Sequence, residues 1–321
     1  MPFPRVRLPA VILLFWLTAT QVYGQDIRPE RYAGTITEQQ LMYHILYLTD
    51  SLAQGRETGT AGAVVACNYI VDKFKEYGLL PFGSYIQGFV CSGNRRGRNV
   101  IGWIPADTPG SDEYLIVSAH YDHLGILNGT LYPGADSNAS GISVLLTLAG
   151  TFGKIKKDGL PVSRNILFVA YDAKEFSMTG AHFFANALTI PTENICLNIN
   201  LDQLGTTLAP PTLSKDYVLV LGAETLPQHM LKSLNNNNSY YNTALDIDYS
   251  FYNSPSFAGI YFSMTEQSVL AQRSVPSLLI TSGVNEHTYK PTDTPEIINP
   301  AAMQKRTKWL FYVLWDLVQR W

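Results

Sequence analysis

The sequence is poor in several features that would indicate other classes of protein. Its 321 residues include only three cysteines, and no two of them form a Cys-x-x-Cys pair, which excludes a zinc knuckle or a dithiol redox motif. The odd count leaves at least one thiol unpaired, so we expect Cys67, Cys91 and Cys196 to be buried structural residues, although the pattern also permits one disulfide. The formal net charge is only −3 and the basic residues are scattered. Neither nucleic acid nor an anionic membrane surface is therefore expected as a partner.

The N-terminal region differs from the rest of the chain. Two arginines precede an apolar run over residues 8–19, and a plausible cleavage point lies before Gln25. This arrangement is typical of a secretory signal peptide, with an uncleaved N-terminal anchor as the alternative. We predict a signal peptide over residues 1–24 and one domain over residues 25–321, exported to the periplasm or the extracellular space. No other run is long and apolar enough for an integral membrane span.

Beyond this region, segments with strand-like and helix-like patterns alternate. Runs rich in β-branched residues predict strands, and apolar residues at helical spacing predict helices. Strands that alternate with helices favour a three-layer α/β/α sandwich around a mixed, mostly parallel sheet. The polar run Asn235–Asn238 is interpreted as a loop tip. The strands are predicted at residues 99–104, 114–119, 165–171, 195–201, 217–222 and 276–281, and the main helices at 37–53, 141–150, 179–188 and 300–321.

Histidine and carboxylate side chains follow the predicted strands where each strand ends. His120 and Asp122 come after one strand, Asp136 lies in a glycine-rich turn, and Glu175 and Asp202 follow two further strands. Each residue alone has an ordinary alternative as a helix cap, a turn residue or a surface side chain. However, the carboxyl ends of strands in an α/β sheet meet in one crevice. Mixed histidine and carboxylate ligands suit zinc, so the set predicts a metal site.

A polar segment near the C-terminal end offers one more ligand. Within residues 286–294, either His287 or Tyr289 could complete the site. A polar surface loop explains this segment equally well when it is considered by itself.

Three segments together resemble a known family. Residues 118–122, 134–141 and 200–202 are similar to the co-catalytic zinc aminopeptidases of peptidase clan MH, and the resemblance extends from about Gly55 to Asn299. Relatives in this clan include bacterial leucyl aminopeptidases, glutamate carboxypeptidase and glutaminyl cyclases. The resemblance implies the same sandwich fold and a peptide or protein substrate.

The resemblance also implies two zinc ions around a water molecule. The metals would lower the pKa of that water and polarise the scissile carbonyl. Asp122 would orient His120, and Asp136 would bridge the two ions. The implied ligands are His120, Asp136, Glu175, Asp202 and His287.

The chain departs from the family pattern at two positions. Lys174 stands where the family has the Glu that takes the proton from the metal-bound water. Two unit charges ~4 Å apart interact by roughly 4 kcal/mol at an effective dielectric of about 20, and a dication doubles this repulsion. We therefore expect Lys174 to point away, to lose its proton, or to replace the charge of a metal ion. Aligned without gaps, Tyr289 takes the place of the last histidine ligand, with His287 two residues earlier.

These departures leave three functional hypotheses. The first is a secreted zinc aminopeptidase-type hydrolase of peptide N-termini, with Asp172 or Glu286 replacing the missing base. The second is a pseudo-peptidase that binds peptides or a protein partner without cleaving them. The third is a single-zinc transferase similar to glutaminyl cyclase, which would need its zinc at Asp136 and Glu175.

Overall fold

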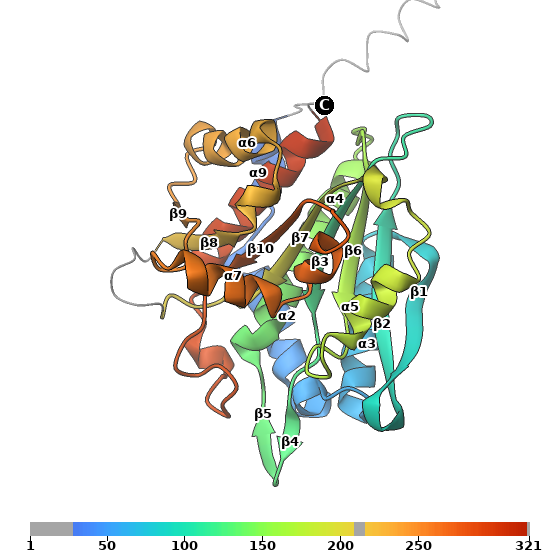
Figure 1. Cartoon of the computed structure of the whole chain (residues 1–321), viewed down its shortest axis with the longest axis vertical. Helices are drawn as coiled ribbons and strands as arrows, with labels where there is room; N and C mark the ends of the chain where they lie inside the picture. Colours follow the sequence, from blue (N-terminus) through green and yellow to red (C-terminus); the bar gives the residue numbers. More distant parts are fainter. Residues whose placement is uncertain (1–27, 209–215, 320–321) are drawn as a thin grey trace, which may run out of the picture.

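The structure, a computed structural model, describes residues 28–208 and 216–319 (Figure 1). The predicted signal peptide lies outside the described residues. No helix in the described ranges is long and apolar enough to cross a membrane. None of the three cysteines, Cys67, Cys91 and Cys196, forms a disulfide, and the first two are buried.

An eight-stranded mixed sheet forms the middle of the molecule, in the order β1-β2-β6-β3-β7-β10-β8-β9. Its four central strands are mutually parallel. Strands β1 and β2 run antiparallel to their neighbours, and β8 runs antiparallel to β10 but parallel to β9. The predicted mixed, mostly parallel sheet is thus confirmed. The strands are β1 (Leu80–Cys91), β2 (Arg95–Ile104), β3 (Tyr114–His120), β6 (Asn165–Tyr171), β7 (Ile195–Asp202), β8 (Tyr217–Leu221), β9 (Asp246–Asp248) and β10 (Ser277–Thr281), with a separate hairpin of β4 (Gly125–Leu127) and β5 (Thr130–Tyr132).

Helices cover both faces of the sheet, which gives the three predicted layers. One apolar core joins a face of the sheet to α2, α3, α4 and α9, and a second core joins the other face to α5 and α8. Asn235–Asn238 lies inside helix α6, so its interpretation as a loop tip was wrong. The helices are α1 (Pro29–Ala33), α2 (Glu38–Thr49), α3 (Ala61–Glu76), α4 (Gly141–Lys157), α5 (Thr179–Asn186), α6 (Gln228–Tyr240), α7 (Pro255–Ser263), α8 (Gln267–Ala271) and α9 (Pro300–Gln319).

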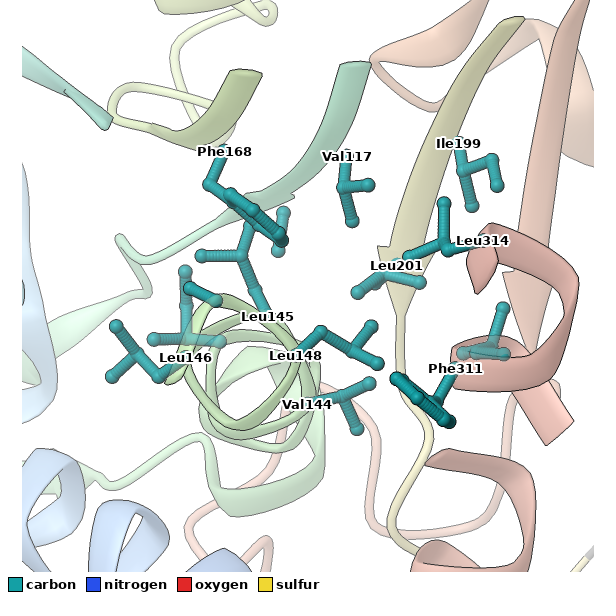
Figure 2. Packing of buried hydrophobic residues seen from close by; sticks show 14 of the residues in the cluster. Val117, Val144, Leu145, Leu146, Leu148, Phe168, Ile199, Leu201, Phe311 and Leu314 are labelled. Carbon is teal, nitrogen blue, oxygen red and sulfur yellow. The ribbon is translucent and has the colours of Figure 1, made fainter. Parts of the chain in front are cut away.

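Helix α4 is the centre of the larger core. Figure 2 shows Leu145 and Leu148 of α4 close to Val117 and Leu201 of the sheet, with Phe311 of α9 beside them. All five side chains are at most 1% exposed, and each contributes about 1.5–3 kcal/mol to folding by leaving water. Because α4 begins directly after the glycine-rich turn, this packing also fixes that turn against the sheet.

A buried histidine between α2 and α3 makes the stability of the fold sensitive to acid. His44 Nδ1 lies 2.6 Å from the Tyr69 hydroxyl oxygen, and burial lowers the pKa of His44 from 6.5 to about 3, helped by the charge of Lys73. The unfolded chain therefore binds a proton below about pH 6.5 that the folded chain refuses. We predict that the free energy of unfolding falls by about 2 kcal/mol between about pH 7 and about pH 5 through this group.

Chemical denaturation at both pH values measures this effect. A His44→Gln variant, which cannot titrate, should lose that part of the pH dependence. An equal pH dependence in the variant and the native protein would show that His44 is not the group responsible.

Candidate functional site

The parallel strands bring His120 and Asp202 together at the carboxyl end of the sheet. His120 ends β3 and Asp202 ends β7, and both side chains are completely buried. His120 Nε2 lies 3.5 Å from Asp202 Oδ1. The other ring nitrogen, Nδ1, lies 3.0 Å from the carbonyl oxygen of Asp122 and so donates to it. This hydrogen bond fixes the ring orientation and aims Nε2 at Asp202.

Asp122 connects this strand end to the loop that follows β6. Its two carboxylate oxygens accept hydrogen bonds from the backbone N–H of Lys174 at 3.0 Å and of Glu175 at 3.1 Å. The carboxylate also lies 3.7 Å from His120 Nδ1. The Asp122 carboxylate therefore holds the backbone of Lys174 and Glu175 next to the histidine, whereas the hydrogen bond that orients His120 is accepted by the Asp122 backbone carbonyl and not by the predicted carboxylate.

Arg56 fixes the opposite side of the site. Its fully buried guanidinium donates to the carbonyl oxygens of Leu48, Tyr121, Pro133 and Gly134 at distances between 2.6 and 2.8 Å. These carbonyl groups lie in α2 (Leu48), directly after β3 (Tyr121) and at the start of the glycine-rich turn (Pro133 and Gly134). One side chain thus keeps several loop segments in fixed relative positions.

Lys174 is directed into the cluster of acids. Its Nζ lies 3.2 Å from the Tyr289 hydroxyl and 5.6 Å from the centre of that ring. Burial lowers the pKa of Lys174, but the charges of Asp202, Tyr289, Glu266 and Glu175 raise it well above its usual value. Tyr289 is thus the direct partner of the Lys174 ammonium, and among the described residues no carboxylate forms an ion pair with it, so Asp202, Glu266 and Glu175 act on its pKa from a longer range.

The acids around Lys174 respond to the same charges. Burial raises the pKa of Asp202, but the charges of Lys174 and His120 lower it to about 2. Burial and the charge of Lys174 lower the pKa of His120, whereas Glu266, Asp122 and Asp202 raise it to about 10. The pKa of Glu175 is raised, chiefly by burial. The positive charges of Lys174 and His120 therefore offset the negative charge of Asp202.

Several buried polar atoms of this cluster have no hydrogen-bond partner among the described residues. They are His120 Nε2, Asp202 Oδ1, Glu175 Oε1 and Glu266 Oε1. Unpaired buried polar atoms cost stability. Their concentration at the carboxyl end of the sheet makes this cluster the candidate functional site.

Asp136, the predicted bridging ligand, already has partners within the protein. One carboxylate oxygen accepts from the Gly205 N–H at 2.8 Å and the Ser140 hydroxyl at 3.1 Å, and the other from the Asn285 amide at 3.0 Å. Burial, followed by the charge of Asp293, raises the pKa of Asp136 to about 7. This carboxylate therefore does not share in the group of unpaired atoms.

The next residue, Ser137, is the one whose side chain is unpaired in this turn. Its hydroxyl is buried without a hydrogen-bond partner among the described residues. The following side chain, Asn138, donates to the carbonyl oxygens of His120 and Leu201 at 3.3 and 2.8 Å. These bonds place the segment between the ends of β3 and β7. A serine gives no sequence signal for a metal site, so sequence reasoning missed this position.

The structure does not bring His287 to the cluster. Its Nδ1 lies 2.9 Å from the Thr292 hydroxyl, and its Nε2 lies 3.9 Å from Glu286. Tyr289 is the residue of this segment that reaches the cluster. Its ring stacks at an interplanar angle of 4° on His123, a fully buried histidine that sequence reasoning did not single out.

Neither proposed replacement for the missing base faces the cluster. The Asp172 oxygens accept from the hydroxyls of Thr58 and Tyr121 and from the backbone N–H groups of Arg98 and Ala173. Glu286 is 81% exposed. The acid that does approach is Glu266, which directly precedes α8 and accepts from the Asn200 amide at 3.0 Å. The sequence alone does not reveal this approach, because Glu266 comes from a distant part of the chain.

These residues do not fit a two-zinc centre. In the two described ranges, no group of three or more His, Cys, Asp or Glu side chains is arranged to hold a metal ion. The Lys174 ammonium would repel a zinc dication bound beside it twice as strongly as it would repel a single positive charge. Asp136 and His287, two of the five predicted ligands, have other partners.

Sequence comparisons relate this chain to a peptidase family. The sequence model of peptidase family M28 matches residues 99–314. Aminopeptidase YwaD of Bacillus subtilis is 29% identical over 35% of this chain and 23% of that protein. The alkaline phosphatase isozyme conversion protein of Escherichia coli is 30% identical over 47% of each chain. The matches thus span less than half the length of these curated relatives.

Solved structures with the same fold include enzymes of different activity. The zinc aminopeptidase BSAP of Bacillus subtilis has a TM-score of 0.70 at 13% identity, over 89% of this chain and 96% of that one. The LapA aminopeptidase of Legionella pneumophila has a TM-score of 0.71 at 17% identity, over 94% and 80%. Glutaminyl cyclase of Porphyromonas gingivalis has a TM-score of 0.67 at 15% identity, over 88% and 99%.

The charge of Lys174 should be a measurable part of the stability. A Lys174→Met change leaves the cluster of acids without its central cation, and we predict a loss of about 2 kcal/mol in the free energy of unfolding at about pH 7. The acids then have raised pKa values in the folded state. Their repulsion should be absent below about pH 4 and grow as the pH rises through their folded pKa values.

The matched control is Lys154→Met, which removes an exposed lysine 3.1 Å from Asp158. Such a surface pair contributes about 0.5 kcal/mol or less. Denaturation curves of the two variants at acid and neutral pH measure the difference. Equal losses in both variants at every pH would show that Lys174 does not neutralise the acids.

Proposed function

Because the chain belongs to peptidase family M28, we propose that it binds peptides in the manner of a peptidase without cleaving them at a two-zinc centre. The family supports a peptidase-type function for this fold. The finer proposal concerns the chemistry at the carboxyl end of the sheet. There, this chain carries a lysine and a tyrosine at the two places where the family resemblance implies a general base and a zinc ligand.

The observation that carries this proposal is the Lys174 ammonium, which lies 3.2 Å from the Tyr289 hydroxyl and whose pKa is raised by the charges of Asp202, Glu266 and Glu175. Buried carboxylates need a counter-ion, and a lysine can supply it where a metal is absent. The raised pKa of Lys174 keeps it protonated, so it cannot accept a proton from water. Lys174 thus argues both against a metal ion bound beside it and against a general base at this position.

The crevice still offers groups that a peptide could use. Glu175 Oε1 and Asp202 Oδ1 are buried acceptors with no hydrogen-bond partner in the described part of the chain. Charge-assisted hydrogen bonds from an ammonium are among the stronger polar contacts. We therefore propose the amino terminus of a peptide as the ligand. The apolar run over residues 8–19 is typical of a signal peptide, so we propose that the protein binds this peptide after export.

The second candidate function is hydrolysis at a single ion. The observation in its favour is the pair His120 Nε2 and Asp202 Oδ1, which lie 3.5 Å apart and lack hydrogen-bond partners among the described residues. The transferase similar to glutaminyl cyclase is less favoured, because the Asp136 carboxylate already accepts three hydrogen bonds within the protein.

Metal content and turnover distinguish these functions. Protein without residues 1–24 is incubated with excess zinc, dialysed and measured by elemental analysis, and is assayed with aminoacyl anilides. We expect well below one zinc ion per chain and no turnover above the buffer rate. Titration calorimetry should detect binding of a short peptide with a free amino terminus, and N-acetylation should weaken it roughly tenfold or more. Two tightly held ions with turnover would establish the hydrolase instead.

A gain of metal affinity tests the same proposal from the opposite direction. The triple variant Ser137→Asp, Lys174→Glu, Tyr289→His removes the internal cation and adds three potential ligands, so we expect zinc affinity to rise roughly a hundredfold or more. The control Lys154→Glu makes the same charge change at an exposed position and should leave zinc affinity unchanged. Equal zinc affinity in the native protein and the folded triple variant would contradict the assignment of Lys174 as the replacement for the metal.

A further inference from the structure

Strand β1 forms one free edge of the eight-stranded sheet. It pairs with β2 on one side, and no strand in the described ranges pairs with its other side. Figure 1 shows β1 at the outer border of the sheet, at the opposite end from β9. An edge strand presents unpaired backbone N–H and C=O groups, which form hydrogen bonds with water or with another strand.

The two edges of the sheet differ in how well they are protected against such pairing. Strand β9 is only three residues long, and two of the three, Asp246 and Asp248, are acidic. Strand β1 is twelve residues long and contains no charged residue. Natural proteins normally protect edge strands with charges, proline or short length. The β9 edge is protected in this way, whereas most of the β1 edge is not.

The regular part of β1 is confined to Ile86–Cys91. Its pairing with β2 is continuous there, and the register shifts between Pro81 and Ile86. Along this part, exposure alternates from residue to residue. Ile86 and Val90 are 38% and 62% exposed, whereas Phe89 and Cys91 are buried. The straight edge is thus about 20 Å long, with apolar side chains on its open face.

We propose that β1 pairs antiparallel with β1 of a second copy of this chain. In a two-fold arrangement centred on Gly88, Ile86 of each copy lies opposite Val90 of the other. These two pairs are apolar, and such pairs stabilise a sheet, while Gln87 of each copy lies opposite Phe89 of the other. Because the strand has no charge, its self-pairing places no like charges directly opposite each other, and Arg96 and Arg98 of β2 lie one strand further away. Gly88 also leaves open space at the axis, since no atom lies within 4 Å of the position that a Cβ there would take.

A cavity beside the edge adds apolar surface to the same region. It has a volume of about 300 Å³ and is lined by Phe82 and Ile86 of β1, Ile101 of β2, and Phe184 and Leu188 from α5 and the residues after it. Side chains of the second copy that extend past the edge would contact this apolar surface. The shared surface is nevertheless small, below about 1,200 Å², so we expect a dimer with a dissociation constant on the order of 10 µM.

Sedimentation velocity over a range of concentrations tests this proposal. We expect the native protein to become dimeric at ~100 µM, and Val90→Lys to weaken the dimer roughly tenfold or more, because a lysine would face Ile86 of the second copy. The control Tyr240→Lys places the same residue at a 70% exposed aromatic position on α6 and should leave the dimer intact. A native protein that stays monomeric at ~100 µM would overturn the proposal.

Hydrogen exchange locates the contact independently. Backbone amides within residues 86–91 that do not pair with β2 should exchange more slowly at high protein concentration, and this protection should be absent in Val90→Lys. A dimer whose exchange over residues 86–91 is independent of concentration would place the contact elsewhere and overturn the proposal. Circular dichroism confirms that both variants keep the native secondary structure.

Discussion

The arrangement of the candidate site depends on the ammonium of Lys174 among buried acids. Parallel strands force the side chains at their carboxyl ends into one crevice, and here those ends supply His120 and Asp202. Acids brought together in this way repel one another unless a cation lies between them. Asp122 binds the backbone N–H of Lys174 and so positions the cation. The sheet topology thus creates the electrostatic problem, and the proposed function assigns its solution to one lysine.

The fold could be predicted because its central strands carry a strong local signal. The largely apolar runs before His120 and Asp202 are buried on both faces and match β3 and β7. Strand β1 lacks such a run, because it contains Pro81 and two glycines, and it was not predicted. Asn235–Asn238 belongs to α6, where the buried Leu234 and Asn237 pack against the protein. Tertiary packing there outweighs the low helix propensity of asparagine.

The candidate site was predictable only where it follows from strand ends. His120 and Asp202 come together as expected, and Glu175 follows through its backbone bond to Asp122. Asp136 does not join this group, because Gly205 and Asn285, which are distant in sequence, donate hydrogen bonds to its carboxylate. No local pattern specifies which of two neighbouring side chains in a tight turn faces the crevice. Tertiary hydrogen bonds make that choice.

The most direct test of the account is a crystal structure of the native protein grown with excess zinc, with anomalous scattering measured on both sides of the zinc absorption edge. The account predicts no anomalous peak between His120 and Asp202, and density for the Lys174 ammonium next to the Tyr289 hydroxyl. Two zinc peaks in the crevice, with the Lys174 side chain displaced toward solvent, would contradict it.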